Sequence, residues 1–345
     1  MSFLDKSGLE VGEVQIESRK LKVLDKIQAT MAKDIEAMND IIDSLLRTDH
    51  TLVNSIIDNY LKTKGKQIRP ILVMLSARMF GEVTERVRYA AASLEMLHNA
   101  TLIHDDVVDQ TPLRRGKPTI NAVWGNHLAV LSGDIFVSKA LEAGIRTGNL
   151  EILQSLSDLG TELSLGEMDQ IFNARGHDLS ETSYFNMIER KTASLFVGCV
   201  RIGAQAVGAS EVEFEALERY ARCLGRAFQI RDDIFDYFPS GDIGKPTGHD
   251  LLEGKVTLPL LAALEAAPRQ VAEPMKELLL TENELIPEEI GTLIEFAKEY
   301  RGIEAAYRKM DELRKEGMRY IDAYIDSESK RYFQEIFDYI IERKY

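Results

Sequence analysis

Hydrophobic residues recur in the first part of the chain with the spacing of amphipathic helices. Between about residues 21 and 46 they fall every three or four positions, which predicts one amphipathic helix, and a second helix is predicted to end near Thr63. Pro70 is predicted to open a strongly apolar helix, because proline is tolerated at the first helical position. Gly81 is expected to end that helix. The first two helices are expected to pack on the outside of the fold.

The same spacing continues to the C-terminus without any alternation that favours a sheet. Helices are predicted over residues 84–110, at three or four places in 119–238, and again in 256–345. No proline occurs between Pro118 and Pro239, and since proline is costly inside a helix, that stretch can be helical throughout. The sequence therefore predicts an all-α chain, in which residues 1–18 form a loose N-terminal extension and residues 19–345 form a single large helical domain.

Composition and charge exclude several classes of protein. The 345 residues are 45% hydrophobic, which is ample for a core. The net charge of −14 argues against nucleic-acid binding, which needs a clustered basic surface. Cys199 and Cys223 lie in apolar surroundings without metal-ligand spacing, so they are predicted to be buried free thiols in a reducing compartment. Because we find no signal-peptide core and no run of 18 uncharged apolar residues, we expect a cytoplasmic protein without a transmembrane segment.

Two copies of the pattern Asp-Asp-x-x-Asp are the candidate chemistry of the chain. DDVVD and DDIFD together supply six carboxylates, from Asp105, Asp106, Asp109, Asp232, Asp233 and Asp236. On a helix, positions i and i+4 share a face, so each copy presents two carboxylates side by side. Apolar neighbours favour a cavity lining over a solvated acidic surface, which is the alternative for either copy alone. If the two helices face each other, the repulsion demands cations such as Mg²⁺, which binds carboxylates together with substrate phosphates.

Separate basic elements accompany the acidic motifs. Lys66 and Arg69 stand three residues apart in GKQIRP, a segment that alone would be interpreted as a solvated loop. Arg114 and Arg115 follow the first acidic motif closely enough to face the same anion, and the arginine fork matches phosphate geometry. The long loop after the second motif contains glycines and Lys245, and its composition suits a flap that closes over phosphate.

The order of these segments resembles the trans-isoprenyl diphosphate synthase family, and within it the long-chain polyprenyl synthetases. Over roughly residues 50–260 the segments are GKQIRP, LEMLHNATLIHDDVVDQTPLRRGKPT, ERKTA, GRAFQIRDDIFDY and GKPTGHDLLEGKVTLP. The resemblance implies an all-helical bundle around a central cavity, with the acidic motifs facing each other across its mouth. It also implies a prenyltransferase that condenses isopentenyl diphosphate with an allylic diphosphate, such as farnesyl or geranylgeranyl diphosphate, to a longer all-trans product.

The resemblance further assigns roles to individual residues. The six aspartates would hold three Mg²⁺ ions with the allylic diphosphate, in unequal shares. The allylic diphosphate or its metals would be contacted by Arg114, Lys191, Gln229, Lys245 and Lys255. The diphosphate of isopentenyl diphosphate would be held by Lys66, Arg69, His98 and Arg115. Thr192 would stabilise the developing cation through an oxygen atom, and His104 would serve packing or support.

Product length should depend on what blocks the tunnel beneath the first acidic motif. The preceding turns of the helix carry no bulky aromatic residue, but Leu97, Ala100 and Thr101. In the family, aromatic residues here accompany short products, so the small side chains predict a longer product, a precursor of a quinone side chain. Neighbouring helices can also set the floor, with Phe136 and the bulky residues after Thr161 as candidates. The segment LGEMDQI, with Gly166, resembles a family helix that lines the cavity.

Three alternatives stay open. A terpene cyclase uses similar metals but lacks the isopentenyl site to which Lys66, Arg69 and His98 are assigned. A non-catalytic subunit of a heteromeric synthase should have lost carboxylates from one acidic motif, whereas both motifs are complete. A geranylgeranyl diphosphate synthase differs only in product length. The resemblance also implies a homodimer, and release of a long product implies transient membrane contact.

Overall fold

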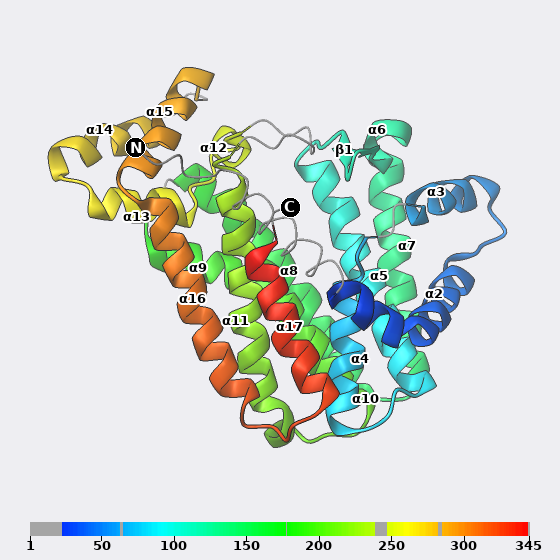
Figure 1. Cartoon of the computed structure of the whole chain (residues 1–345). Helices are drawn as coiled ribbons and strands as arrows, with labels where there is room; N and C mark the ends of the chain where they lie inside the picture. The colour runs from blue at the N-terminus through cyan, green and yellow to red at the C-terminus, as the bar shows by residue number, and fades with distance from the viewer. Residues whose placement is uncertain (1–22, 63–64, 177, 239–246, 282–284, 344–345) are drawn as a thin grey trace, which may run out of the picture.

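The computed structural model describes residues 23–62, 65–176, 178–238, 247–281 and 285–343 of the chain. Over these ranges the chain is almost entirely helical, which confirms the predicted all-α class (Figure 1). The predicted N-terminal extension and Lys245 lie outside the described residues. No helix in the described ranges is long and apolar enough to cross a membrane.

The helices begin with a helical stretch over residues 23–30 and continue along the chain in the following order. They are α2 (Ala32–Leu46), α3 (Thr51–Leu61), α4 (Ile68–Phe80), α5 (Glu85–Val108), α6 (Ile120–Trp124), α7 (Asn126–Arg146), α8 (Leu150–Gly176), α9 (Glu181–Ile188), the π-helix η1 (Glu189–Ala193), α10 (Ser194–Ala206), α11 (Glu211–Phe235), α12 (His249–Leu252), α13 (Leu258–Ala266), α14 (Arg269–Leu279), α15 (Pro287–Glu299), α16 (Gly302–Ile321) and α17 (Glu328–Glu342). A two-residue pair of strands, β1 (Leu113–Arg114) and β2 (Lys117–Pro118), joins α5 to α6.

Several helix boundaries differ from the prediction. The helix expected over residues 21–46 is interrupted by a turn at Met31, and Pro70 is the third rather than the first residue of α4. The stretch 119–238 holds more than the three or four helices predicted. Its breaks coincide with Gly125, Gly148 and Gly208, whose φ angles of 84°, 65° and 82° favour glycine and end helices without a proline.

Helix α10 forms the centre of the core. All of its residues except Ser194 and Arg201 are buried, and it packs against α4, α5, α8 and α11. Gly203 allows its close approach to α4, because a Cβ atom there would lie 2.2 Å from the carbonyl oxygen of Val73. Cys199 and Cys223 are buried free thiols, as predicted. The core therefore fixes the helices that carry the candidate site.

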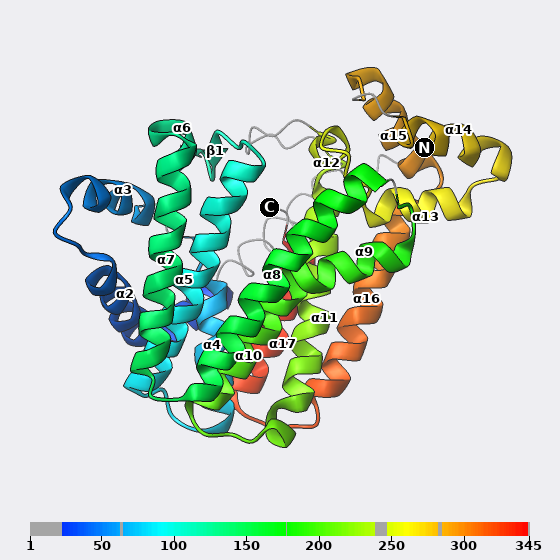
Figure 2. The same cartoon turned by 180° about the vertical axis from the view of Figure 1, so that it is seen from behind.

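Both acidic motifs lie at the same end of the bundle. Helices α5 and α11 run in the same sense, so that their C-terminal ends, next to β1 and to α12, both lie at the top in the two opposite views (Figures 1 and 2). The segment TPLRRGKP, expected to be a loop, folds into the β1–β2 hairpin. Its turn residues Arg115 and Gly116 have φ angles of 53° and 72°, which suits a tight two-residue turn.

Candidate active site

Three cavities adjoin one another at this end of the bundle. The cationic cavity, about 480 Å³, is lined by residues of α3, α4, α5 and the hairpin and by Arg343 after α17. The apolar cavity, about 410 Å³, lies among α5, α8, α10 and α11. The acidic cavity, about 180 Å³, is lined from α9, α11 and the segment after α12. Arg69 and His98 line both the cationic and the apolar cavity, while Lys191 and Gln229 line both the apolar and the acidic cavity.

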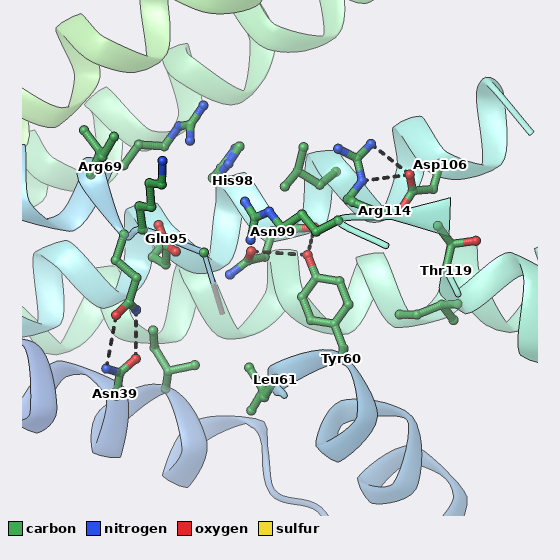
Figure 3. A pocket seen from close by; sticks show the side chains of 18 of the residues that line it. Asn39, Tyr60, Leu61, Arg69, Glu95, His98, Asn99, Asp106, Arg114 and Thr119 are labelled. Carbon is green, nitrogen blue, oxygen red and sulfur yellow. Dashed lines mark hydrogen bonds and ion pairs between the residues drawn. The ribbon is translucent and has the colours of Figure 1, made fainter. Parts of the chain in front are cut away.

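The cationic cavity is lined by all four residues assigned to isopentenyl diphosphate, namely Lys66, Arg69, His98 and Arg115. Arg69 and His98 are labelled in Figure 3. Lys66 Nζ donates to Tyr339 Oη at 2.7 Å. Arg69 lies over the ring of Phe196, 5.8 Å from its centroid, and its buried Nε finds no hydrogen-bond partner in the described part of the chain. An anion with several acceptor oxygens would satisfy this donor.

Electrostatics inside the cationic cavity favour an anionic ligand. Burial lowers the pKa of Arg69, and burial together with Arg69 and Arg115 lowers the pKa of His98, which is therefore a neutral imidazole near pH 7. Its Nδ1 is buried and has no partner among the described residues. Glu95, one turn before His98, lines the same cavity, and burial raises the pKa of its carboxyl against the influence of both arginines.

In the first acidic motif the three carboxylates have different surroundings. Asp106 is buried and accepts hydrogen bonds from Arg114 Nε and Nη2, each at 2.8 Å. The hairpin turn makes this contact possible because it folds Arg114 back onto α5 (Figure 3). The carboxylates of Asp105 and Asp109 make no hydrogen bond or ion pair with the described residues, although the Asp109 backbone N–H donates to the Asp105 carbonyl. Burial raises the pKa of Asp105 to about 6, with Lys191 opposing the shift.

The three carboxylates of the second acidic motif also have different partners. Asp232 forms an ion pair with Arg343, whose guanidinium lies 4.1 Å from the ring centroid of Phe228. Asp233 is 3% exposed, and it accepts from Tyr184 Oη at 2.6 Å and from Gln229 Nε2 at 2.8 Å. Asp236 accepts from the backbone N–H groups of the first two residues of α12, each at 3.0 Å. It thereby holds the N-terminal end of α12 next to the C-terminal end of α11.

Lys191 and Thr192 belong to the π-helix η1, an irregular form that often marks functional sites. Lys191 Nζ donates to Gln170 Oε1 at 3.0 Å and pairs with Glu167. Thr192 Oγ1 donates to Gln229 Oε1 at 2.7 Å. Helix α8 approaches η1 at Gly166, where a Cβ atom would lie 2.5 Å from the backbone nitrogen of Lys191.

Lys255 lines the acidic cavity from the segment that follows α12. It forms an ion pair with Glu253 at 2.6 Å, and Lys191 lines the same cavity. Asp250, absent from the sequence prediction, lines the same cavity. Most of the predicted site residues that the structure describes line at least one of the three cavities, and the exceptions are Leu97, Ala100, Asp109, Asp232 and Asp236.

The residues predicted to control product length divide into two groups. Thr101 lines the apolar cavity together with Leu163 and Leu195. Leu97 and Ala100 are buried and line none of the three cavities. Ala100 lies seven residues after Ser93, on the same side of α5, and the Ser93 hydroxyl donates to the Ala140 carbonyl of α7. This stripe of α5 therefore packs on α7.

Sequence reasoning missed four residues of the site. Tyr184 and Arg343 lie outside the quoted segments, whereas Glu95 lies within LEMLHNATLIHDDVVDQTPLRRGKPT but has no role assigned from the sequence. In GHDLLEGK only Lys255 is assigned a role from the sequence, which leaves Asp250 out. One sequence signal could have identified Glu95, because it lies about one helical turn before His98 and therefore on the same side of the helix.

The carboxylates of the two acidic motifs are the candidate ligands of a metal ion. Within the described ranges no three carboxylate, imidazole or thiol groups converge closely enough to hold one. The expected convergence of the acidic side chains is therefore absent from this conformation, in which Arg114 and Arg343 neutralise Asp106 and Asp232. The donors Asp105, Asp109 and Asp232 still fit Mg²⁺, because this ion uses one or two carboxylates and completes its shell with water and substrate phosphates.

Comparison with known proteins identifies similar chains. A sequence model of the polyprenyl synthetase family matches residues 50–293. Component 2 of heptaprenyl diphosphate synthase from Bacillus subtilis is 35% identical over 301 residues, which cover 87% of this chain and 84% of that protein. A polyprenyl synthase from Caulobacter crescentus, crystallised with calcium and isoprenyl diphosphate, is 29% identical with a TM-score of 0.86, covering 93% and 98% of the two chains. A geranylgeranyl pyrophosphate synthase from Bacteroides thetaiotaomicron is 35% identical with a TM-score of 0.80, covering 94% and 100%.

Proposed function

The chain belongs to the polyprenyl synthetase family and is a prenyltransferase, and we propose that it condenses isopentenyl diphosphate with an allylic prenyl diphosphate to a longer all-trans polyprenyl diphosphate. The observation that carries this proposal is the junction of the cationic and apolar cavities at Arg69, His98 and Leu102. A diphosphate in one cavity and a hydrocarbon chain in the other would meet at this junction.

In this arrangement the cationic cavity receives the diphosphate of isopentenyl diphosphate. Arg69 and Arg115 supply forked donors, Lys66 supplies a point charge, and neutral His98 supplies a ring N–H. The allylic substrate places its chain in the apolar cavity and its diphosphate between the two acidic motifs, within reach of Lys191 and Lys255. A terpene cyclase needs no second diphosphate site, so the cationic cavity supports a synthase.

Divalent metal ions belong to the chemistry of this family, and Mg²⁺ is the ion proposed here. Asp105, Asp109 and Asp232 would hold the ions, and in bound form the ions neutralise the negative charge that develops on the departing diphosphate. The count of three ions stays a prediction. We assign Asp106, Asp233 and Asp236 to holding Arg114, Gln229 and α12, and these contacts support the unequal shares that the resemblance implies.

The chain's own residues position the reacting atoms. Lys191 and Arg114 stabilise the leaving diphosphate as the allylic carbon–oxygen bond breaks, and the apolar cavity excludes water from the resulting carbocation. The oxygens of Thr192 and Gln229 border the position of that charge. The double bond of isopentenyl diphosphate attacks the cation, and the released diphosphate accepts the proton, so no nucleophilic side chain is required.

For the product we propose a chain longer than geranylgeranyl, built on farnesyl or geranylgeranyl diphosphate and used as a quinone side-chain precursor. Small Thr101 supports this because it borders the apolar cavity without closing it. Ala100 supports it less, since it packs on the α7 side of α5. A geranylgeranyl product is the alternative, and in that case Leu163 and Leu195 would form the floor.

We further propose that the chain works as a homodimer through the outer face of α7. Large apolar side chains are exposed there, at 57% for Leu131, 45% for Leu141 and 64% for Ile145. Contiguous exposed apolar residues of this kind favour a protein interface. Pairing with a different subunit is the alternative that the name of the B. subtilis relative raises. Sedimentation and activity of the chain purified alone distinguish the two, since a homodimer is active without a second component.

The separate use of the two cavities can be tested with Lys66→Ala. In the proposed reaction Lys66 contacts only isopentenyl diphosphate, so its removal should raise KM for that substrate at least tenfold and change KM for the allylic substrate less than twofold. Lys276→Ala, a half-buried lysine on α14 that lines none of the three cavities, serves as the matched control and should change neither constant. Equal increases for both substrates in Lys66→Ala would contradict the assignment of the cavities.

A further inference from the structure

A chain of hydrogen bonds connects a buried tyrosine with the apolar cavity. It begins at Tyr184 on α9, which is 4% exposed, and passes through Asp233 and Gln229 on α11. It ends at Thr192 on η1, which lines the apolar cavity. The three bonds measure 2.6, 2.8 and 2.7 Å. Tyr184 itself lines the acidic cavity and does not border the apolar one.

Each bond in this chain has a defined direction. Tyr184 Oη and Gln229 Nε2 both donate to Asp233, and these two hydrogen bonds oppose the burial that raises the pKa of its carboxyl to about 8. Because the amide nitrogen of Gln229 is turned to Asp233, its oxygen is turned to Thr192 and can only accept. The hydroxyl hydrogen of Thr192 is therefore used for Gln229, and only lone pairs of Oγ1 remain for the apolar cavity.

We propose that Tyr184 is a positioning residue that, through Asp233 and Gln229, keeps the Thr192 hydroxyl oriented with its lone pairs toward the carbocation formed in the apolar cavity. A hydroxyl that can rotate would present its hydrogen to the cation part of the time. A fixed acceptor stabilises developing positive charge without reorganisation during the reaction. This inference rests on the proposed function, because it assumes that a cation forms in the apolar cavity.

Tyr184 is needed because two donors fix a carboxylate in one plane, whereas one donor does not. In Tyr184→Phe, Gln229 is the only remaining donor to Asp233, so the Asp233 carboxyl group can rotate about its side-chain bond. The Gln229 amide and then the Thr192 hydroxyl would lose their fixed orientations. The substitution removes one oxygen atom and keeps the ring that packs edge-on against Phe185. Tyr220→Phe is a matched control, since it removes another buried hydroxyl, one that donates to the Phe333 carbonyl remote from the cavities.

The test is a double-mutant cycle in kcat at saturating Mg²⁺. Tyr184→Phe should lower kcat on the order of tenfold, as expected for the loss of about 1.4 kcal/mol of transition-state stabilisation, with both KM values within twofold of wild type. In a Thr192→Val background Tyr184→Phe should not lower kcat any further. In a Thr192→Ser background, which keeps the hydroxyl, Tyr184→Phe should still lower kcat. Multiplying losses in the double variant, or a changed Mg²⁺ requirement in Tyr184→Phe, would show that Tyr184 acts elsewhere.

A crystal structure of Tyr184→Phe tests the inference independently of activity. The contact between Thr192 Oγ1 and Gln229 Oε1 should be lost or lengthened beyond hydrogen-bond range, and an unchanged contact would overturn the proposal even if turnover falls. Should that variant fail to fold, Gln229→Leu breaks the chain at its middle and should reduce kcat to the level of Thr192→Val. If the wild-type chain makes no prenyl product, the proposed function fails while this structural comparison still decides the role of Tyr184.

Discussion

Gly166 is the point where α8 touches the backbone of the π-helix η1, and its replacement by alanine gives a sharp prediction. The new Cβ would lie 2.5 Å from Lys191 N, 2.8 Å from Lys191 Cα and 3.0 Å from the carbonyl carbon of Arg190. All three are backbone atoms, so no side-chain rotation relieves the contact. The shortest distance is 0.9 Å less than the 3.4 Å at which ordinary contact begins, so η1 must move by nearly that amount.

Such a shift displaces the Lys191 ammonium and the Thr192 oxygen together. Misplacement of a catalytic group by about 1 Å costs on the order of a hundredfold in rate, and overpacking costs about 1 to 3 kcal/mol of stability. Gly166→Ala should therefore lower kcat by about a hundredfold and also lower the melting temperature.

Gly160→Ala is the matched control on the same helix, because nothing lies within 4 Å of its Cβ position. That variant should be stabilised by about 0.5 to 1 kcal/mol, since alanine is the better helix former, with turnover unchanged. Steady-state kinetics and thermal unfolding followed by circular dichroism measure both effects. More than half of wild-type turnover in folded Gly166→Ala would refute the claim that η1 must be held where it is.

Three further predictions concern the metal site and the product. Arg343→Met should lower the Mg²⁺ concentration for half-maximal rate by up to about fivefold, since a partly exposed ion pair of at most about 1 kcal/mol no longer competes for Asp232; an unchanged Mg²⁺ titration would contradict this. Burial raises the pKa of Asp105 to about 6 from 3.8, so in Mg²⁺-free buffer its contribution to stability is present below pH 4 and lost as pH rises through 6. Asp105→Asn should consequently gain up to about 3 kcal/mol over wild type between pH 4 and 7 in denaturant titrations, and a constant difference would be inconsistent with that shift. Thr101→Phe should shorten the product, and more strongly than Ala100→Phe; the reverse order in product chromatography would place the tunnel on the α7 side of α5.

Motifs with internal spacing could be interpreted from the sequence, because helical periodicity and charge act over a few residues. DDVVD and DDIFD, the proline-poor stretches and the order of the basic segments were enough for the all-α class and for most of the site. Helix breaks were harder to predict, because the sequence shows that a residue is glycine but not whether it adopts the positive φ that ends a helix. Gly148 and Gly208 are examples.

Partners across the fold could not be predicted at all. The distinction between Asp232, held by Arg343, and Asp233, held by Tyr184, depends on contacts between residues 111 and 49 positions apart in the chain. The packing of Ala100 toward α7 depends in the same way on which face of α5 meets which neighbour. Such features arise from tertiary packing, which one-dimensional periodicity describes only as buried or exposed.

The proposed synthase activity is tested most directly by incorporation of labelled isopentenyl diphosphate by the purified chain, with Mg²⁺ and farnesyl diphosphate, followed by chromatography of the dephosphorylated products. We expect a ladder of labelled prenols that extends beyond geranylgeraniol and disappears when either the metal or the allylic primer is omitted. A folded protein that incorporates no label, or that releases a cyclic hydrocarbon from farnesyl diphosphate alone, would contradict it.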